Sequence, residues 1–395
     1  MRCSWRKALL LVCAIPAGSA CRSGPAPLPS RELIRNGGFE EGGDLPEGWR
    51  SEGFQGVGQV ARWTGEPISG KASLRLEISA PDVVATNDGR RGANPLKVVQ
   101  VVEPAPVGEV VTVRARARSI DLEGEATILA KVVTPDRRRT LLGRSIAWTG
   151  KESAGGAVEK STSFYVPGGA GALEISVDVL GRGAALVDDV GVAAGPPPSF
   201  APHVNLLQNP GFEQDRASWT TYVGQATASF DVVKDAARTG GAGARISRTQ
   251  ADPENPALVN WGQEVIGPGF KGQEIVMSGW IRARNVNGRA MFGVYLQGFD
   301  ADGAPGSKWV MFEDQAIRGT TEWKRVSKRI QIKDVEVHSV TVRAMLDGTG
   351  TVDVDDVYMG IGGRRSNTMF WVVPVAVAIV LLLMALGRLR RPATA

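Results

Sequence analysis

Apolar and polar side chains alternate along most of the chain between residues 33 and 361. The clearest runs are VVTVRARARSI at 110–120 and EIVMSGWIRARNV at 274–286, and a period of two is typical of a β-strand with one buried face. Further strands are predicted at SLRLEIS, ATILAKVV, FYVPG and LEISVDVL, and later at ARISR, MFGVYLQGF, KWVMFE, KRVSKRIQI and SVTVRAML. The 49 glycines fit the many short turns of a sandwich or barrel. We therefore expect an all-β region without a long helix.

This region repeats itself. LIRNGGFEEGGDLPEGW at 33–49 is echoed by LLQNPGFEQDRASW at 206–219, and ALVDDVGV at 185–192 is echoed by VDVDDVYMG at 352–360. A repeat of this length indicates two copies of one domain. The predicted boundaries are 33–194 for module one, 195–204 for a Pro-rich linker and 205–361 for module two. Consecutive prolines favour a stiff, extended spacer between the copies.

The N-terminal twenty residues have the pattern of an export signal. Three basic residues precede an apolar run and the small residues Gly18, Ser19 and Ala20, as in a cleaved signal peptide. Cys21 follows at once, in the position of a lipidated cysteine after lipoprotein signal cleavage. Ordinary signal-peptidase cleavage and an uncleaved anchor are the alternatives for 1–20.

A second apolar run, 369–387, lies near the C-terminus and is uncharged. As a helix it would rise about 28 Å, which matches the hydrocarbon layer of a bilayer. The basic tail 388–395 would stay in the cytoplasm by the positive-inside rule, which leaves the modules outside. We therefore expect a transmembrane helix at 369–387 and a membrane-anchored protein of the cell envelope. A cleaved C-terminal sorting signal is the alternative.

Composition excludes several kinds of site. All three cysteines, Cys3, Cys13 and Cys21, lie in or beside the export signal, so neither module can hold a disulfide or a thiolate metal site. The only histidines are His203 and His338, which argues against a histidine metal site or a Ser-His-Asp triad. Of the 46 Lys and Arg, eight lie before residue 21 or after 361, so the region between carries 38 basic and 41 acidic side chains. Nucleic-acid binding therefore has no electrostatic support.

The opening motif Asn-x-Gly-Phe-Glu followed by Trp, and the closing Asp-Asp-Val, resemble those of CenC-type carbohydrate-binding modules in the galactose-binding-like jelly-roll superfamily. The matching residues are Asn36, Gly38, Phe39, Glu40, Trp49, Asp188 and Asp189 in module one, and Asn209, Gly211, Phe212, Glu213, Trp219, Asp355 and Asp356 in module two. SGKASLRLEIS at 69–79 and TGGAGARIS at 239–247 fit the family's Gly-rich turn and strand. The resemblance implies two tandem antiparallel jelly-roll β-sandwiches, with Trp49, Trp219, Trp280 and Trp323 at core positions.

The resemblance also implies a structural calcium ion. If the first and last strands of a module lie side by side, Glu40 comes near Asp188 or Asp189, and the second copy repeats this with Glu213, Asp355 and Asp356. Carboxylate and carbonyl oxygens suit a hard cation such as Ca²⁺. The alternative is that one Asp faces water and the Glu caps a turn.

Sugar binding needs exposed flat aromatic rings with amides or acids beside them. In module two we predict Trp261 and Trp309 as platforms, with Tyr222, Tyr295, Gln263 and Gln297 nearby. The alternative is that both tryptophans pack under loops. Module one has Val in the strand KVVQVVEP where module two has Trp261, and offers only Trp63 and Trp148, so it is interpreted as a spacer.

Catalysis is not expected. Glycosidases use two carboxyl groups, but with 41 acids such a pair always exists, and the two copies leave no room for a catalytic domain. The run RARAR at 114–118 is open to two interpretations, a patch for anionic glycans or a solvated sheet face. The sequence therefore predicts a non-catalytic envelope protein that binds extracellular or envelope polysaccharide. The alternative is a structural ectodomain that docks an envelope protein.

Overall fold

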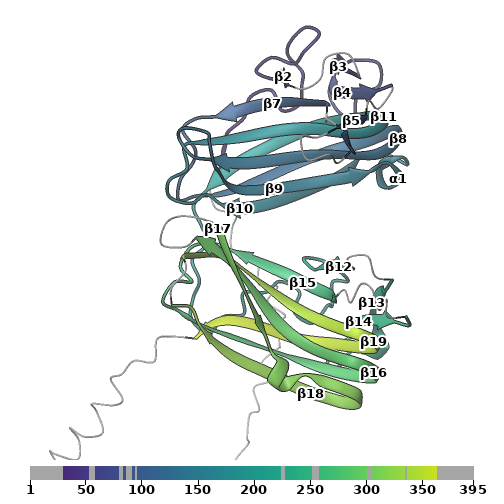
Figure 1. Cartoon of the computed structure of the whole chain (residues 1–395), viewed down its shortest axis with the longest axis vertical. Helices are drawn as coiled ribbons and strands as arrows, with labels where there is room; N and C mark the ends of the chain where they lie inside the picture. Colours follow the sequence, from purple (N-terminus) through teal and green to yellow (C-terminus); the bar gives the residue numbers. More distant parts are fainter. Residues whose placement is uncertain are drawn as a thin grey trace, which may run out of the picture.

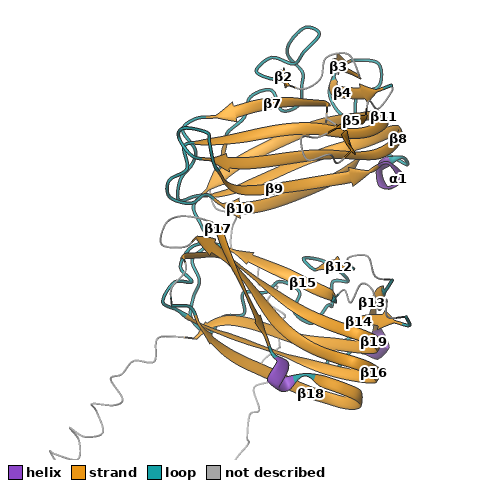
Figure 2. Ribbon diagram, viewed as in Figure 1, coloured by secondary structure: helices purple, strands orange, loops and turns teal. Residues whose placement is uncertain are grey.

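The computed structural model describes residues 30–362, apart from short segments at 53–57, 80–82, 86–90, 94–95, 224–226, 251–257, 300–304 and 334–335. It consists of two β-sandwiches joined by the linker (Figures 1 and 2). Module one contains β1 (Arg31–Glu32), β2 (Arg50–Glu52), β3 (Gly58–Trp63), β4 (Ser73–Ile78), β5 (Val83–Ala85), β6 (Arg91–Ala93), β7 (Leu96–Val102), β8 (Val110–Val133), β9 (Thr140–Thr149), α1 (Gly150–Ser153), β10 (Val158–Tyr165) and β11 (Ala172–Gly195). Module two contains β12 (Thr220–Tyr222), β13 (Ser229–Val233), η1 (Lys234–Ala236), β14 (Gly243–Arg248), β15 (Val259–Ile266), β16 (Glu274–Phe299), β17 (Pro305–Met311), η2 (Glu313–Gln315), β18 (Ile317–Gln331) and β19 (Glu336–Gly362).

Each module has two antiparallel layers that share two long strands. In module one, β8 and β11 pair along their lengths; one half of the pair joins β10, β4 and β3, and the other half joins β9, β7 and β2. The strands bend between the layers at glycines: Gly181 has φ +102°, and a Cβ there would lie 2.1 Å from the Glu123 carbonyl oxygen. Two predicted strands, 110–120 and ATILAKVV, are therefore one bent strand.

Module two repeats this plan with β16 and β19 as the shared strands. One layer is β13-β14-β19-β16-β18 and the other is β12-β15-β19-β16-β17. Alternate side chains of both layers face inward and form the core, in which Trp261, Phe212 and Phe292 are fully buried. The all-β, two-sheet prediction is confirmed.

One glutamine occupies the same position in both modules and makes the same pair of hydrogen bonds. The Gln100 side chain bridges the backbone of Arg35, accepting from its N–H at 2.7 Å and donating to its carbonyl at 3.0 Å. Gln263 holds Gln208 in the same way, at 2.7 and 2.8 Å. These glutamines lie on β7 and β15. If they are taken as equivalent, the strand pairings assign each residue of one module to its counterpart in the other.

In each module, the first residues lie next to the last strand. In module one the Leu33 amide donates to the Val192 carbonyl at 2.8 Å, and in module two the Leu206 amide donates to the Met359 carbonyl at 2.8 Å. Entry and exit of the chain therefore lie at the same side of each sandwich.

The modules contact one another through a small set of side chains. Phe299, at the end of β16, is buried against the core of module one, and its ring centroid lies 5.0 Å from that of His338. Arg144 of β9 reaches Glu264 of β15. Module two thus meets module one along the ends of β15, β16 and β19.

The prediction of a C-terminal transmembrane helix as part of the fold requires correction. Within the described ranges no helix has the length and apolarity needed to cross a membrane. The predicted segments 1–20, Cys21, 369–387 and 388–395 lie outside the described residues.

Candidate ligand-binding cleft

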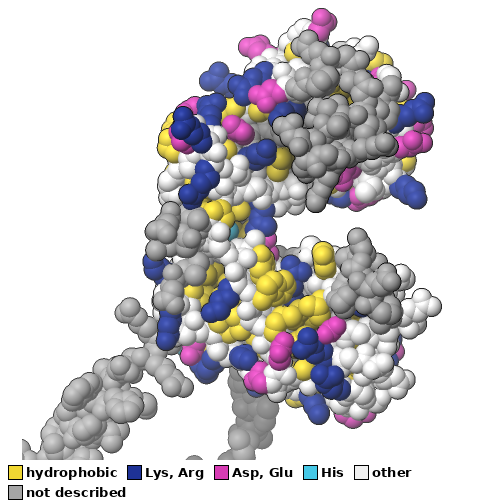
Figure 3. Space-filling view, in the orientation of Figure 1, with side chains coloured by type: hydrophobic (Ala, Val, Ile, Leu, Met, Phe, Trp, Pro, Cys, Tyr) yellow, Lys and Arg dark blue, Asp and Glu magenta, His cyan; other side chains and the backbone are white. Residues whose placement is uncertain are grey.

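The layer β12-β15-β19-β16-β17 of module two has one apolar and one polar face. Trp261, Val265 and Val342 point into the core, and the intervening residues point outward because successive strand residues alternate sides. A cavity of about 360 Å³ lies over the outward face, and Figure 3 shows a hollow between the modules on the side of β12 and β15. Its lining residues are Arg144, Ser218, Thr220, Gly262, Gln263, Glu264, Tyr295, Gln297, Thr341 and Arg343.

Aromatic rings stand at this cleft. Tyr295 on β16 and Trp309 on β17 are paired across the strands, and their ring centroids are 4.6 Å apart. The Trp309 side chain is 46% exposed. Tyr222, 56% exposed, pairs with Asn260 at the opposite edge of the same layer. Exposed rings with polar groups between them are the features that hold a sugar ring by stacking and hydrogen bonds.

Arg343 lies on β19 in the middle of the layer. Its guanidinium carbon is 5.2 Å from the Trp309 ring centroid, and its Nη1 donates to Asn260 Oδ1 at 2.8 Å. Burial lowers the pKa of the Arg343 guanidinium, and the nearby Tyr295 and Glu264 act in the opposite direction. A half-buried cation thus sits beside the exposed tryptophan.

Module one contributes Arg144 to this cleft. Its Nη2 donates to Glu264 Oε1 at 2.5 Å and to Gln297 Oε1 at 3.1 Å. The contact closes one end of the cleft, so the lining is shared between the modules.

The structure corrects one of the six predicted binding residues, Trp261. Trp261 is 0% exposed and packs between Phe212 and Phe230, with ring centroids at 6.0 and 5.4 Å. The prediction that it is an exposed platform is wrong, because its side of β15 faces the core. Gln263 borders the cavity, but both ends of its amide bind Gln208.

The other four predicted residues, Trp309, Tyr222, Tyr295 and Gln297, lie on or beside the cleft. Sequence reasoning missed Arg343, Arg144 and Glu264. A signal for Arg343 existed, since it is the one charge in the apolar run SVTVRAML. No signal linked Arg144 and Glu264, because they belong to different modules.

Among the described residues, the same layer of module one has no aromatic platform. The strand registers place Glu52 of β2, Lys131 of β8 and Gly143 of β9 where module two has Tyr222, Tyr295 and Trp309. Trp148 is fully buried in the core. Trp63 lies on the edge strand β3, with the Arg75 guanidinium 4.4 Å from its ring centroid.

Two of the four tryptophans expected in the core are there. Trp49 and Trp219 are buried, and their indole N–H groups donate to the carbonyls of Asn36 and Asn209. Trp280 and Trp323 are instead partly exposed on the second layer of module two. They stack against Arg238 at 3.6 Å and Arg282 at 4.9 Å respectively.

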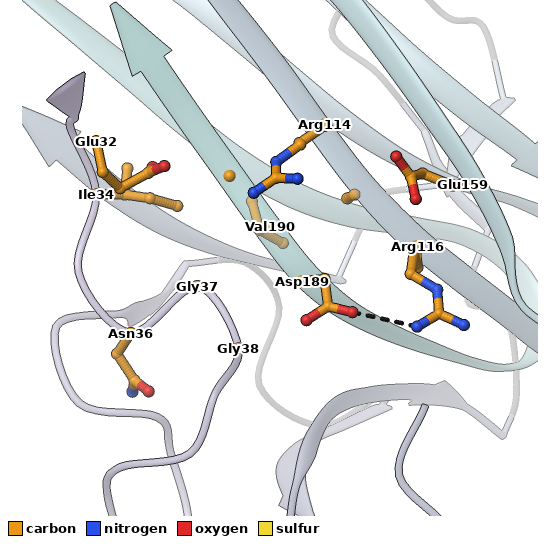
Figure 4. Close-up of a pocket in the computed structure, with 12 residues that line it drawn as sticks. Glu32, Ile34, Asn36, Gly37, Gly38, Arg114, Arg116, Glu159, Asp189 and Val190 are labelled. Atoms are coloured by element: carbon orange, nitrogen blue, oxygen red, sulfur yellow. Dashed lines mark hydrogen bonds and ion pairs between the residues drawn. The ribbon is translucent and has the colours of Figure 1, made fainter. Parts of the chain in front are cut away.

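Module one carries a cavity of about 570 Å³ near its entry strand, where Glu32, Arg114, Arg116 and Asp189 project toward the opening (Figure 4). Arg116 Nη1 lies 3.3 Å from Asp189 Oδ2. Arg118, two residues further along the RARAR run, pairs with Glu66. The run does form one face, but two of its three arginines are neutralised, as expected for a solvated sheet face. No described residue of the lining is aromatic.

The acids of the opening and closing motifs lie on either side of Gly38 in module one. Asp188 is buried, and its Oδ2 accepts from the Ser69 amide and the Ser73 hydroxyl, both at 2.9 Å. Glu40 accepts from the Lys71 amide at 2.9 and 3.0 Å. Gly38 lies between these acids: a Cβ there would be 3.8 Å from Glu40 Cγ and 4.0 Å from Asp188 Oδ1.

Module two repeats this arrangement. Asp355 accepts from the amides of Arg238 and Thr239, and Glu213 accepts from the Gly241 amide. The second acid of each closing motif is turned to an arginine: Asp189 to Arg116 and Asp356 to Arg238.

The acids of these motifs have a donor chemistry that suits a hard cation. Burial raises the pKa of Asp188 and of Asp355, so each charge is costly where it stands. A cation held by Glu40 with Asp188, and by Glu213 with Asp355, would offset that cost. In the part of the chain that the structure describes, no group of three or more His, Cys, Asp or Glu could hold a metal ion. Calcium therefore stays a prediction.

Comparison with protein-family models finds no match, and comparison with curated proteins finds none either. Similar solved structures include the N-terminal CBM22-1–CBM22-2 tandem domain of Paenibacillus barcinonensis Xyn10C, with a TM-score of 0.31 and 16% identity over 86% of this chain and 100% of that one. A family 22 carbohydrate binding module of Clostridium thermocellum Xyn10B has a TM-score of 0.30 and 17% identity over 42% and 97%. The enzymatically active domain of bacteriophage CBA120 tailspike protein 4 has a TM-score of 0.32 and 13% identity over 41% and 22%. At these values the similarities carry no information about the ligand.

Proposed function

We propose that module two binds a polysaccharide chain in its cleft without cleaving it, and that module one supports the cleft. The observation that carries the proposal is the pairing of Trp309 and Tyr295 at the surface of a layer whose cavity is lined mainly by polar side chains. A sugar stacked on these rings would place its hydroxyls toward Thr341, Gln297 and the backbone of β15. The assignment of both modules to the CenC type is part of this proposal.

The acids of the cleft support binding without cleavage. Glu264 is the only carboxylate among the described lining residues, and it is engaged by Arg144. Glycoside hydrolysis by the usual route needs a pair of carboxyl groups on either side of the scissile bond. The cleft offers one carboxylate, already in an ion pair.

The test is binding of the full chain to soluble and insoluble polysaccharides, followed by tryptophan fluorescence. We expect saturable binding that changes the emission and is lost in Trp309→Ala, at a cost of about 1–3 kcal/mol for one stacked ring. Trp323→Ala is the matched control, because Trp323 is partly exposed on the other layer. Absence of binding by a folded chain, or equal loss in both variants, would contradict the proposal and direct the search to protein partners.

A further inference from the structure

The charge of Arg343 is not balanced by a carboxylate. Within the described residues no Asp or Glu forms an ion pair with it, and its Nη1 binds the neutral amide oxygen of Asn260. Its Nε is buried and has no hydrogen-bond partner among those residues. A half-buried guanidinium with an unsatisfied donor is costly, and an anionic acceptor would compensate it.

The one acid nearby is already engaged. Glu264 pairs with Arg144, whose Nε is likewise buried without a partner in the described part of the chain. The described lining therefore carries two guanidinium groups and one carboxylate. This leaves one positive charge for a ligand, and Arg144 removes the group that would otherwise repel an anion.

The positive charge lies beside the rings that would hold the sugar. The Arg343 guanidinium is 5.2 Å from the Trp309 ring centroid, and the Trp309 ring packs at a tilt of 36° against Tyr295. A sugar ring held on this pair would keep its substituents within reach of Arg343. The planar edge of a guanidinium matches the two oxygens of a carboxylate.

We propose that the cleft takes an acidic polysaccharide, one whose sugar rings carry carboxylate groups, and that Arg343 binds the carboxylate. This inference rests on the proposed function of module two and names its ligand class. It also assigns Arg144 the role of neutralising Glu264 rather than of contacting the ligand's acid.

The test compares one polymer with and without its carboxyl groups, and adds a sulfated polymer of a different backbone. The full chain is titrated with polygalacturonate, with the same polymer after chemical reduction of its carboxyl groups, and with dextran sulfate. We expect binding to polygalacturonate that weakens with salt, and a loss of about tenfold to a hundredfold on carboxyl reduction, as for one charge-assisted hydrogen bond. This comparison needs no variant, so it does not depend on the folding of a mutant.

A variant then assigns the residue. Arg343→Gln should lose the preference for polygalacturonate and retain binding of the reduced polymer, with Arg114→Gln on module one as the control. Equal affinity for both polymers, with loss in Trp309→Ala, would overturn the acidic ligand and leave the proposed function standing. Preference for dextran sulfate would overturn the proposal that Arg343 binds a carboxylate. Failure to bind any glycan would overturn both this inference and the proposed function.

Discussion

Arg144 of module one and Glu264 of module two are joined by an ion pair of 2.5 Å across the module boundary. Their side chains are 21% and 28% exposed, and Arg144 also donates to Gln297. The pair therefore both closes the cleft and fixes the position of one module against the other.

A double-mutant cycle on this pair should give a coupling energy of about 1 kcal/mol, because the pair is partly shielded from water. The variants are Arg144→Ala, Glu264→Ala and their combination, measured by denaturant unfolding. The pair Arg50–Glu52, which is more exposed and lies within module one, should give less. Strict additivity at Arg144 and Glu264 would show that the modules are not held by this contact.

His338 should make the protein less stable at acid pH. Burial, with a smaller contribution from Arg144, lowers the pKa of His338 to about 4. The unfolded chain takes up this proton near pH 6.5 and the folded chain only near pH 4, so stability falls as the pH drops through that interval, by at most about 3 kcal/mol. Unfolding measured from pH 7 to 4 should be less pH-dependent in His338→Gln. An unchanged slope in that variant would argue against a neutral, buried His338.

Asp353→Asn should destabilise module two by about 3 kcal/mol. Asp353 is buried and forms ion pairs with Arg245, Arg282 and Arg284 at 2.7 to 2.8 Å. Removing its charge leaves three guanidinium groups facing one another. Asp347→Asn is the control, since Asp347 has one arginine partner and is 29% exposed, and it should cost less than about 1 kcal/mol. Equal effects in urea unfolding would contradict the role of Asp353 as the centre of this cluster.

Calcium removal tests the predicted metal sites. If Glu40 with Asp188 and Glu213 with Asp355 hold calcium, EDTA should lower the Tm and calcium should restore it. At a hundredfold excess of calcium over Kd, each site should add about 3 kcal/mol to the free energy of unfolding. Glu40→Gln should abolish the response of module one only. The calcium prediction would be wrong if mass spectrometry detects no metal and the Tm changes with neither EDTA nor calcium. The acids would then be held by hydrogen bonds within the protein alone.

Trp261→Ala should destabilise the protein by about 3–5 kcal/mol, as expected for a large cavity in a core. Trp309→Ala should change stability by less than about 1 kcal/mol while weakening ligand binding by about 1–3 kcal/mol. Chemical unfolding of the two variants separates the roles of these tryptophans. Similar losses of stability would mean that Trp309 is packed rather than presented.

The strands and the repeat could be predicted because both depend on local patterns. Alternation gave the strands, and the loops built on Asn36 and Asn209 follow from a contiguous motif. Which face of a strand is buried depends on the partner layer. The sequence therefore could not show that Trp261 is buried and Trp309 exposed, because each lies in a run with both polar and apolar neighbours. Arg144 and Glu264 meet only because two domains dock, and no pattern within either domain records that contact.

The adjacent ends of each module determine how the protein occupies space. Leu33 lies beside Val192, and Leu206 beside Met359, so each module returns the chain to the point where it entered. The ten-residue linker 195–204 spans at most about 35 Å. The two ends of each module are therefore adjacent, so the distance that the backbone covers from the start of module one to the end of module two is set mainly by the linker and not by the length of the strands.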